Sequence, residues 1–192
     1  MNYHTHSAFG LLFTLLTVKI IVSLELLDIS YLLHGSLLDG TLIKFYLAAF
    51  LGAFGPDIDH AQSKIGQLFW FISKPLKFLG VKHRGLTHSF LGISLFVLLT
   101  RQLVVYSWID KITWWGLISG YISHIVADMM NVQGIPLFFP LDKRFKFHSN
   151  ITTNSWQEQT LFFIIIFATA IIFLQERSYI NLSEIINLVT LN

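Results

Sequence analysis

ITWWGLISGYISHIVADMM, residues 112–130, is a largely apolar stretch that carries His124 and Asp128 near its end. About 20 predominantly apolar residues are long enough to cross a bilayer as a helix. Residues four apart lie on the same face of a helix, so the histidine and the aspartate share one side. Ionisable groups inside a span usually face the bundle interior and mark function. The stretch predicts a membrane helix with a functional face, and a buried ion pair that locks two helices together is the alternative interpretation.

The composition of the whole chain also indicates a membrane protein. Of the 192 residues, 54% are hydrophobic and only 12% are charged, whereas soluble domains carry about 25% charged residues. The formal net charge of +2 gives no argument for nucleic-acid binding. Because the chain has no cysteine, disulfides, zinc–thiolate sites and cysteine nucleophiles are excluded. Any metal must therefore be held by His, Asp and Glu.

Further apolar stretches flank this one and predict a single integral membrane domain over residues 1–192. The five predicted spans cover residues 8–26, 37–56, 86–107, 112–130 and 159–175. A shorter stretch at 65–79 is interrupted by Pro75 and predicts a broken amphipathic helix on the membrane surface. The expected fold is an all-α, polytopic bundle of about five transmembrane helices with this short interfacial helix.

Basic residues are concentrated in two of the segments between the predicted spans. Residues 57–85 contain five Lys or Arg, and residues 131–158 contain three. Since cytoplasmic loops carry an excess of Lys and Arg, these two segments and the N-terminus are predicted to be cytoplasmic, with the C-terminus on the other side. This topology gathers most of the potential metal ligands at one end of the bundle.

The motif GPDIDH, residues 55–60, follows the second predicted span directly. It places Asp57, Asp59 and His60 in a tight polar turn opened by Gly-Pro. Carboxylate and imidazole groups suit zinc, manganese or iron(II). Solvated acids at the end of a helix are the alternative interpretation.

The motif VKHRGLTHSF, residues 81–90, stands at the start of the third predicted span. A turn at Gly85 would let His83 and His88 point at one centre, with Arg84 between them. An arginine in this place suits an anionic group, above all a phosphate. The alternative is that Arg84 only sets the topology and that the histidines are interfacial.

Two weaker motifs lie near the ends of the predicted bundle. His6, in HTH at residues 4–6, precedes the first predicted span and is a candidate for the same site. Ser155 and Glu158, in TNSWQE at 153–158, have the spacing of a capping box ahead of an apolar run. Helix capping is therefore favoured over metal binding for Glu158.

Taken in order, these motifs resemble those of the YdjM/YbcI family of bacterial inner-membrane proteins, which are described as metal-dependent hydrolases. The resemblance extends over about residues 4–158, and Asn154 replaces a glycine that the family tends to show. The motifs that carry it are H-x-H at 4–6, PDIDH at 56–60, HRGLTHS at 83–89, and SHIVAD at 123–128 followed by NVQGIPLFFP at 131–140.

That family is distantly similar to zinc-dependent phospholipase C enzymes, in which His and Asp ligands, including a helical His-x-x-x-Asp, hold a cluster of zinc ions. The resemblance therefore implies a phosphoester hydrolase in the bacterial inner membrane. By position in the motifs, it implies six metal ligands, which are His6, Asp57, His83, His88, His124 and Asp128.

Three functions remain open at this point. The first is a metal-dependent hydrolase acting on a phosphoester of a membrane lipid or headgroup at the cytoplasmic interface. It would use zinc or manganese, with Asp59 or Asp57 orienting water and Arg84 holding phosphoryl oxygens. The second is a non-enzymatic protein with a structural metal site, or a metal-ion transporter. The third is a membrane scaffold in which histidines pair with acids; no oligomeric state is predicted.

Overall fold

The computed structural model describes residues 1–35, 39–78, 83–147, 149 and 151–177. Every regular element in these ranges is a helix, and none is a strand, so the predicted all-α class is confirmed. Two 3-10 helices, η1 and η2, interrupt the α-helices. The elements are α1 Tyr3–Ser23, α2 Tyr31–His34, α3 Gly40–Gly52, η1 Gly55–Asp59, α4 Lys64–Leu68, α5 Trp70–Phe78, η2 Leu86–His88, α6 Phe90–Val105, α7 Lys111–Met129 and α8 Trp156–Glu176.

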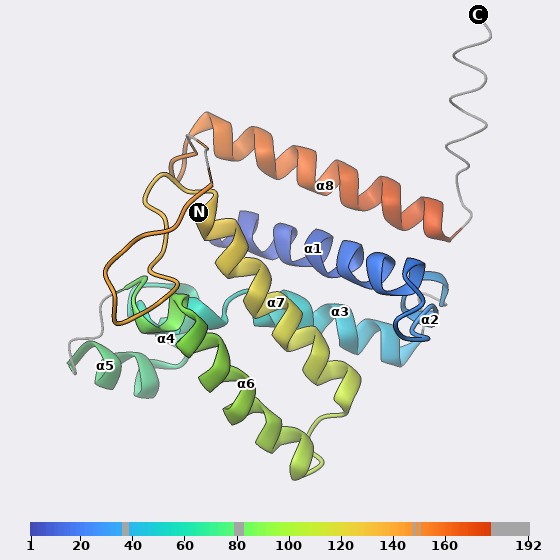
Figure 1. Cartoon of the computed structure of the whole chain (residues 1–192), viewed down its shortest axis with the longest axis horizontal. Coiled ribbons are helices and arrows are strands. Elements are labelled where there is room, and N and C mark those ends of the chain that lie inside the picture. The colour runs from blue at the N-terminus through green and yellow to red at the C-terminus, as the bar shows by residue number, and fades with distance from the viewer. Residues whose placement is uncertain (36–38, 79–82, 148, 150, 178–192) are drawn as a thin grey trace, which may run out of the picture.

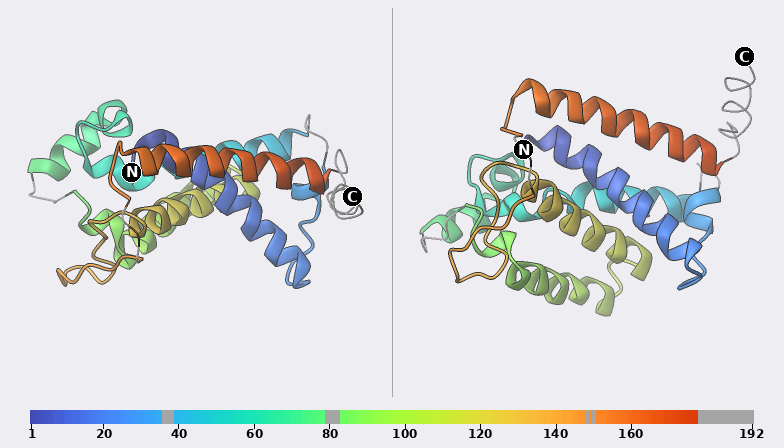
Figure 2. Two further views of the ribbon diagram at one scale, coloured as in Figure 1. Left: turned by 90° about the horizontal axis from the view of Figure 1, so that it is seen from above. Right: turned by 45° about the horizontal axis from the view of Figure 1, so that its top comes forward.

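The five longer helices form a bundle around α7 (Figure 1). α7 packs against α1, α3 and α6, and α8 packs against α1. Helices α1, α6 and α8 begin at the same end of the bundle at which α3 and α7 end, and we call this the motif end. Helices α4 and α5 and the long segment between α7 and α8 also lie there, and Figure 2 shows the same grouping from two other sides. The opposite end holds α2 and the last turn of α8.

Helices α3 and α7 approach closely because small residues line their contact. A Cβ added at Gly120 would clash with the carbonyl oxygen of Ala49 and would lie 2.8 Å from the backbone nitrogen of Ala53. Such small residues let membrane helices pack backbone against backbone, and Gly116 and Gly120 have the spacing of the G-x-x-x-G motif. The contact fixes the position of the next turn of α7, which carries His124.

Two of the predicted spans, now α1 and α8, are confirmed as helices long and apolar enough to cross a membrane. Helix α3 has 13 residues and α6 has 16. At 1.5 Å per residue they extend over about 20 and 24 Å, which is less than the roughly 30 Å of a hydrocarbon core. Both are shortened at the motif end because η1 and η2 take up residues that the prediction gave to spans. Residues 37 and 38 of the second predicted span lie outside the described residues, and the five-span topology stays a prediction.

The first helix begins earlier than expected, at Tyr3 instead of residue 8. The side chain of Asn2 accepts a hydrogen bond from the backbone N–H of Thr5 and caps the helix there. His6 therefore lies within α1, and its predicted place in a segment ahead of the helix is wrong.

Residues 65–78 of the predicted interfacial segment are mostly helical and mostly exposed, as predicted, but the helix breaks elsewhere, and residue 79 lies outside the described residues. Helix α4 ends at Leu68 and α5 begins at Trp70, while Pro75 lies inside α5. The hydroxyl of Ser73 donates to the carbonyl of Gly66 at 2.6 Å and ties α5 to α4. The predicted break at Pro75 is wrong because the chain turns at Phe69, between the two helices and well before the proline.

Candidate metal centre

A cluster of three histidines and two carboxylates lies at the motif end, where four elements converge. α1 contributes His6, η1 contributes Asp57, η2 contributes His88, and α7 contributes both His124 and Asp128. Four of the side chains are at most 2% exposed, and that of Asp57 is 21% exposed. The cluster is therefore closed on most sides and opens beside Asp57.

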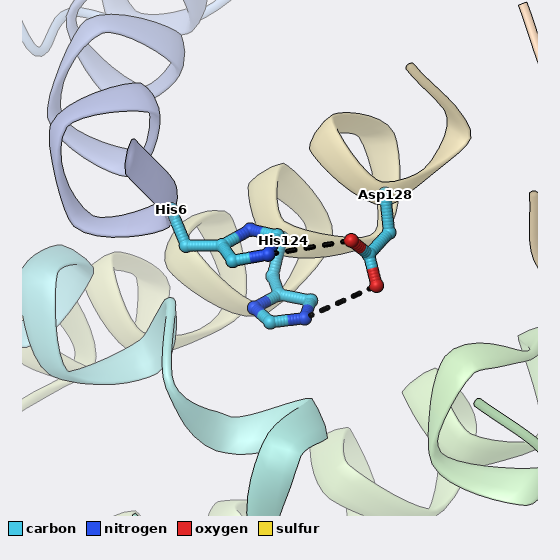
Figure 3. A group of neighbouring side chains, drawn as sticks. All are labelled: His6, His124 and Asp128. Atoms are coloured by element: carbon cyan, nitrogen blue, oxygen red, sulfur yellow. Dashed lines mark ion pairs between the residues drawn. The ribbon is translucent and has the colours of Figure 1, made fainter. Parts of the chain in front are cut away.

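The ligand atoms of the cluster form two overlapping groups. His6, His124 and Asp128 make one group, and Asp57, His88 and His124 make the other. Within each group the atoms lie within 4.8 Å of one another. Figure 3 shows the first group, in which the rings of His6 and His124 stack with centroids 3.7 Å apart beside the carboxylate. Because His124 belongs to both groups, they form one continuous site.

The distances inside this site fit the edges of a metal coordination sphere. Nε2 of His88 lies 3.2 Å from Nε2 of His124 and 3.3 Å from Oδ2 of Asp128. Nε2 of His124 lies 3.7 Å from the same oxygen and 3.6 Å from Oδ1 of Asp57. Charge-assisted hydrogen bonds are about 2.7–2.9 Å long, shorter than all four distances. Four ligands held about 2.0–2.1 Å from a tetrahedral zinc stand about 3.4 Å apart, which is within this range.

Hydrogen bonds on the outer side of two rings leave their inner nitrogens available. Nδ1 of His124 lies 2.7 Å from the carbonyl oxygen of Ala53, which can only accept, so Nδ1 carries the hydrogen. The hydroxyl of Thr87 donates to Oδ2 of Asp59 at 2.5 Å and lies 3.0 Å from Nδ1 of His88, from which it can accept. Both Nε2 atoms therefore face the cluster as lone-pair donors. Such outer partners are typical of metal-binding histidines.

The carboxylate of Asp128 connects the cluster to Arg84. Oδ1 lies 2.9 Å from Nη2 of Arg84, 3.3 Å from Nε2 of His6 and 3.2 Å from the backbone nitrogen of Met1. Arg84 has a φ of 57°, in the left-handed region, and its side chain points inward to bond Gln133 as well. Its buried Nε and the buried Nδ1 of His6 have no hydrogen-bond partner in the described part of the chain. An unpaired buried N–H is costly, so the Nε–H of Arg84 is available to a bound group.

Asp57 is the carboxylate that lies nearest to solvent. Burial disfavours its charged form, but the neighbouring His124, His6 and His88 outweigh burial and hold the pKa of this carboxyl below its ordinary value. Its Oδ1 also lies 3.8 Å from Nε2 of His88. The group is therefore charged at neutral pH and faces the inner nitrogens, as a ligand does.

The structure brings five of the six predicted ligands together and leaves out His83. Nδ1 of His83 lies 2.9 Å from Oδ1 of Asp59, and the side chain is 36% exposed. Asp59, a predicted catalytic residue, is buried behind His88 and is engaged by His83 and Thr87. Arg84 reaches the cluster through Asp128. Whether any of these residues binds a metal or takes part in catalysis stays a prediction.

The analysis of the sequence did not anticipate some residues that hold this site together. Glu158 is completely buried and accepts from the backbone N–H groups of Asn2, at 2.5 Å, and Asn154, at 2.6 Å. The predicted cap is also present, because the hydroxyl of Ser155 accepts from the N–H of Glu158 at 3.2 Å. Thr87 was missed as well, although its place between Arg84 and His88 in a polar motif was the available signal.

The chain is similar to a family of bacterial membrane proteins over nearly its whole length. A family model described as YdjM inner membrane protein matches residues 1–191. The chain is 39% identical to the inner membrane protein YdjM of Escherichia coli (strain K12) over 100 residues. This stretch covers 52% of the present chain and 50% of the relative. The protein of the same name in Shigella flexneri gives the same identity and the same coverage. It is 37% identical over 109 residues to the uncharacterized protein YvsG of Bacillus subtilis (strain 168), with 57% and 65% covered. The chain thus matches about half to two thirds of the length of these relatives, and no solved structure matches it.

Proposed function

The chain belongs to the YdjM inner membrane protein family, and we propose that it is a metal-dependent hydrolase acting on a phosphoester of a membrane lipid or headgroup. One observation carries the proposal. Inner nitrogens and carboxylate oxygens lie 3.2–3.8 Å apart in a buried site, with the outer nitrogens of His88 and His124 already paired. Zinc suits this set of ligands best, and manganese is the second choice.

The donor set also distinguishes this site from a scaffold of ion pairs. Three imidazoles, one guanidinium and the backbone nitrogen of Met1 lie 2.9–3.7 Å from Asp128, which is more groups than the roughly four lone-pair sites of one carboxylate can accept. Removing a metal from such a site leaves these groups crowded and incompletely satisfied.

The residues around the cluster supply the remaining parts of a phosphoester hydrolase. A divalent ion held there would provide Lewis-acid activation of water at neutral pH. Oδ1 of Asp57, the more exposed of the two predicted bases, faces the ligand nitrogens, and its other oxygen is left to accept a proton from water. Asp59 orients His88 through Thr87, and Nε of Arg84 offers a free N–H to a phosphoryl oxygen.

We place the site at the cytoplasmic face of the membrane. Lys74 and Lys77 on α5, and Lys143, Arg144 and Lys146 in the segment after α7, lie with the cluster at the motif end, and such an excess of basic residues is typical of the cytoplasmic side. In this proposal five helices cross the bilayer. A metal-ion transporter is the alternative, but the cluster lies at one end of the bundle instead of along a path through it.

The proposal is tested first by the metal content of the detergent-purified protein, measured by elemental mass spectrometry. Asp128→Asn keeps the shape of the side chain and removes its charge, and Glu176→Gln is the matched control at the opposite end. At least one zinc or manganese per chain is expected in the wild type and in the control, and none in Asp128→Asn. The metal-loaded protein should then hydrolyse a chromogenic phosphodiester.

Other results assign the cluster differently. Absence of stoichiometric metal from all three proteins, purified without chelator, would overturn the proposal in favour of the scaffold. Metal without hydrolysis across a panel of phosphomonoesters and phosphodiesters would indicate a structural site. Metal flux into liposomes that is lost in Asp128→Asn would indicate a transporter.

A further inference from the structure

A cavity of about 290 Å³ lies beside the metal cluster and shares none of its proposed ligands. It is open to the surface and lies between η1, the turn that follows η1, the last turn of α5 and the start of the HRG turn. The lining residues are Asp59, His60, Ala61, Gln62, Lys77 and His83.

Lys77 gives this cavity a positive charge. It is exposed, and it forms no ion pair with any residue that the structure describes. Lys74, one helical turn earlier, lies instead over the ring of Trp70, with Nζ 5.1 Å from the ring centroid. The two lysines thus have the same charge and the same helix but different surroundings, and only Lys77 lines the cavity.

His60 adds a hydrogen-bond donor, and the ring nitrogen that carries the hydrogen can be assigned. The backbone N–H of Gln62 donates to Nδ1 of His60 at 3.2 Å, so the neutral ring carries its hydrogen on Nε2. The rings of His60 and His83 meet edge to face with centroids 4.6 Å apart. The lining of the cavity therefore includes a residue with an ammonium group and one with an imidazole N–H.

The carboxylate in the cavity wall is already satisfied. Asp59 is buried, with Oδ1 2.9 Å from Nδ1 of His83 and Oδ2 accepting from the hydroxyl of Thr87. Its charge is thus directed to these partners, and the donors of Lys77 and His60 remain for a ligand. An anion with several acceptor oxygens fits these donors. The phosphate group of a phosphoester is such an anion.

We infer that this cavity is a phosphate-binding subsite next to the metal centre, which holds a phosphate group of the substrate. The inference deepens the proposed function and rests on it. Asp59 is the shared wall, since it lines the cavity and is linked through Thr87 to His88. The exposed Trp70 and Phe71 on α5 place the cavity at the level of lipid headgroups. A phosphate held there lies beside the metal centre at which its ester would be hydrolysed.

The test compares Lys77→Gln with Lys74→Gln in the full-length protein, purified in detergent with its native metal. Binding of inorganic phosphate, glycerol phosphate and a short-chain phosphatidic acid is measured by titration calorimetry. Lys77→Gln should weaken binding about tenfold, because a charge-assisted hydrogen bond is lost. Lys74→Gln should change binding less than about twofold, and both variants should keep the metal content of the wild type.

The three ligands also identify the source of the phosphate. Similar affinity for all three supports a subsite for soluble phosphates, while binding of the phosphatidic acid alone supports a lipid headgroup. Equal weakening by both substitutions, or no weakening by either, overturns the inference. Phosphate binding that disappears when the wild type is stripped by chelator, and is unchanged in Lys77→Gln, assigns the phosphate to the metal and also overturns it. Lys77-dependent binding in a protein without metal would keep the subsite and reject the hydrolase.

Discussion

The ionisable residues at the two ends of the bundle are paired in different ways. At the opposite end, Lys19 of α1 pairs with Glu176 of α8, and His34 bonds the carbonyl of Glu176 at 2.5 Å. Lys19 and His34 thus each have a hydrogen-bond partner on the last turn of α8. At the motif end, Asp128 is shared among three histidines and an arginine, at distances of 2.9–3.7 Å. Opposite charges that pair one to one indicate structure, whereas convergent imidazoles around a shared carboxylate indicate a bound cation.

The difference between the two ends is tested most directly by substituting one histidine at each end. His124→Ala removes the nitrogen that both ligand groups share, and complete loss of bound metal is expected. His34→Ala is the matched control and should keep all of it. Elemental mass spectrometry of both purified variants measures this, and equal metal content in the two would contradict the distinction between the ends.

The next largest effect is expected where α3 and α7 touch. Gly120→Ala should lower the free energy of unfolding by about 3 kcal/mol, because the added methyl meets the backbone of Ala49 and Ala53 and cannot be accommodated by a side-chain rotation. Gly40→Ala is the control, since a Cβ there has no atom within 4 Å. Thermal unfolding in detergent is the measurement. Similar midpoints for the two variants would show that the close contact does not position His124.

A smaller effect is expected behind the ligands, at Asp59. Asp59→Asn should weaken metal affinity 10- to 100-fold, as is usual for outer partners of a ligating histidine, because the amide keeps only one acceptor oxygen for Thr87 and His83, and Thr87 in turn orients His88. Asp142→Asn, on the exposed segment after α7, should leave affinity unchanged. Competition with a metal-binding dye measures both. Complete loss of metal in Asp59→Asn would instead make Asp59 a ligand.

The smallest effect is expected at the opposite end. Lys19 is 41% exposed in its pair with Glu176, so Lys19→Gln should cost less than about 1 kcal/mol of unfolding free energy. Metal content and phosphate binding should be those of the wild type. Thermal unfolding and elemental analysis check the two statements, and a loss of metal would mean that the two ends are coupled through α1.

The sequence predicted the membership of the cluster better than its geometry. Helical spacing joined His124 to Asp128, and the alternation of helix direction brought Asp57 and His88 to them, because both effects depend only on the order of the elements. The failure at His83 has a local cause. Arg84 adopts a left-handed backbone, which no feature of HRGLTH predicts for an arginine, and the adjacent His83 pairs with Asp59 outside the ligand groups.

The predicted boundaries of two helices were wrong for a related reason. Hydropathy extended the second and third spans through residues that form η1 and η2 in the structure. A 3-10 turn changes the direction of successive side chains, and this is how Asp57 and His88 reach the centre. The residues that spoil the regular helix are therefore those that complete the site, and an average over hydropathy does not detect them.

The bond between Glu158 and the backbone of Asn2 also has a consequence for biosynthesis. His6 is synthesised before α8, and Asn2, which caps the turn of α1 that carries His6, is bonded to the first turn of α8, 156 residues further along the chain. This bond forms only after α8 has left the ribosome. In the proposed function, metal loading would therefore follow the insertion of α8.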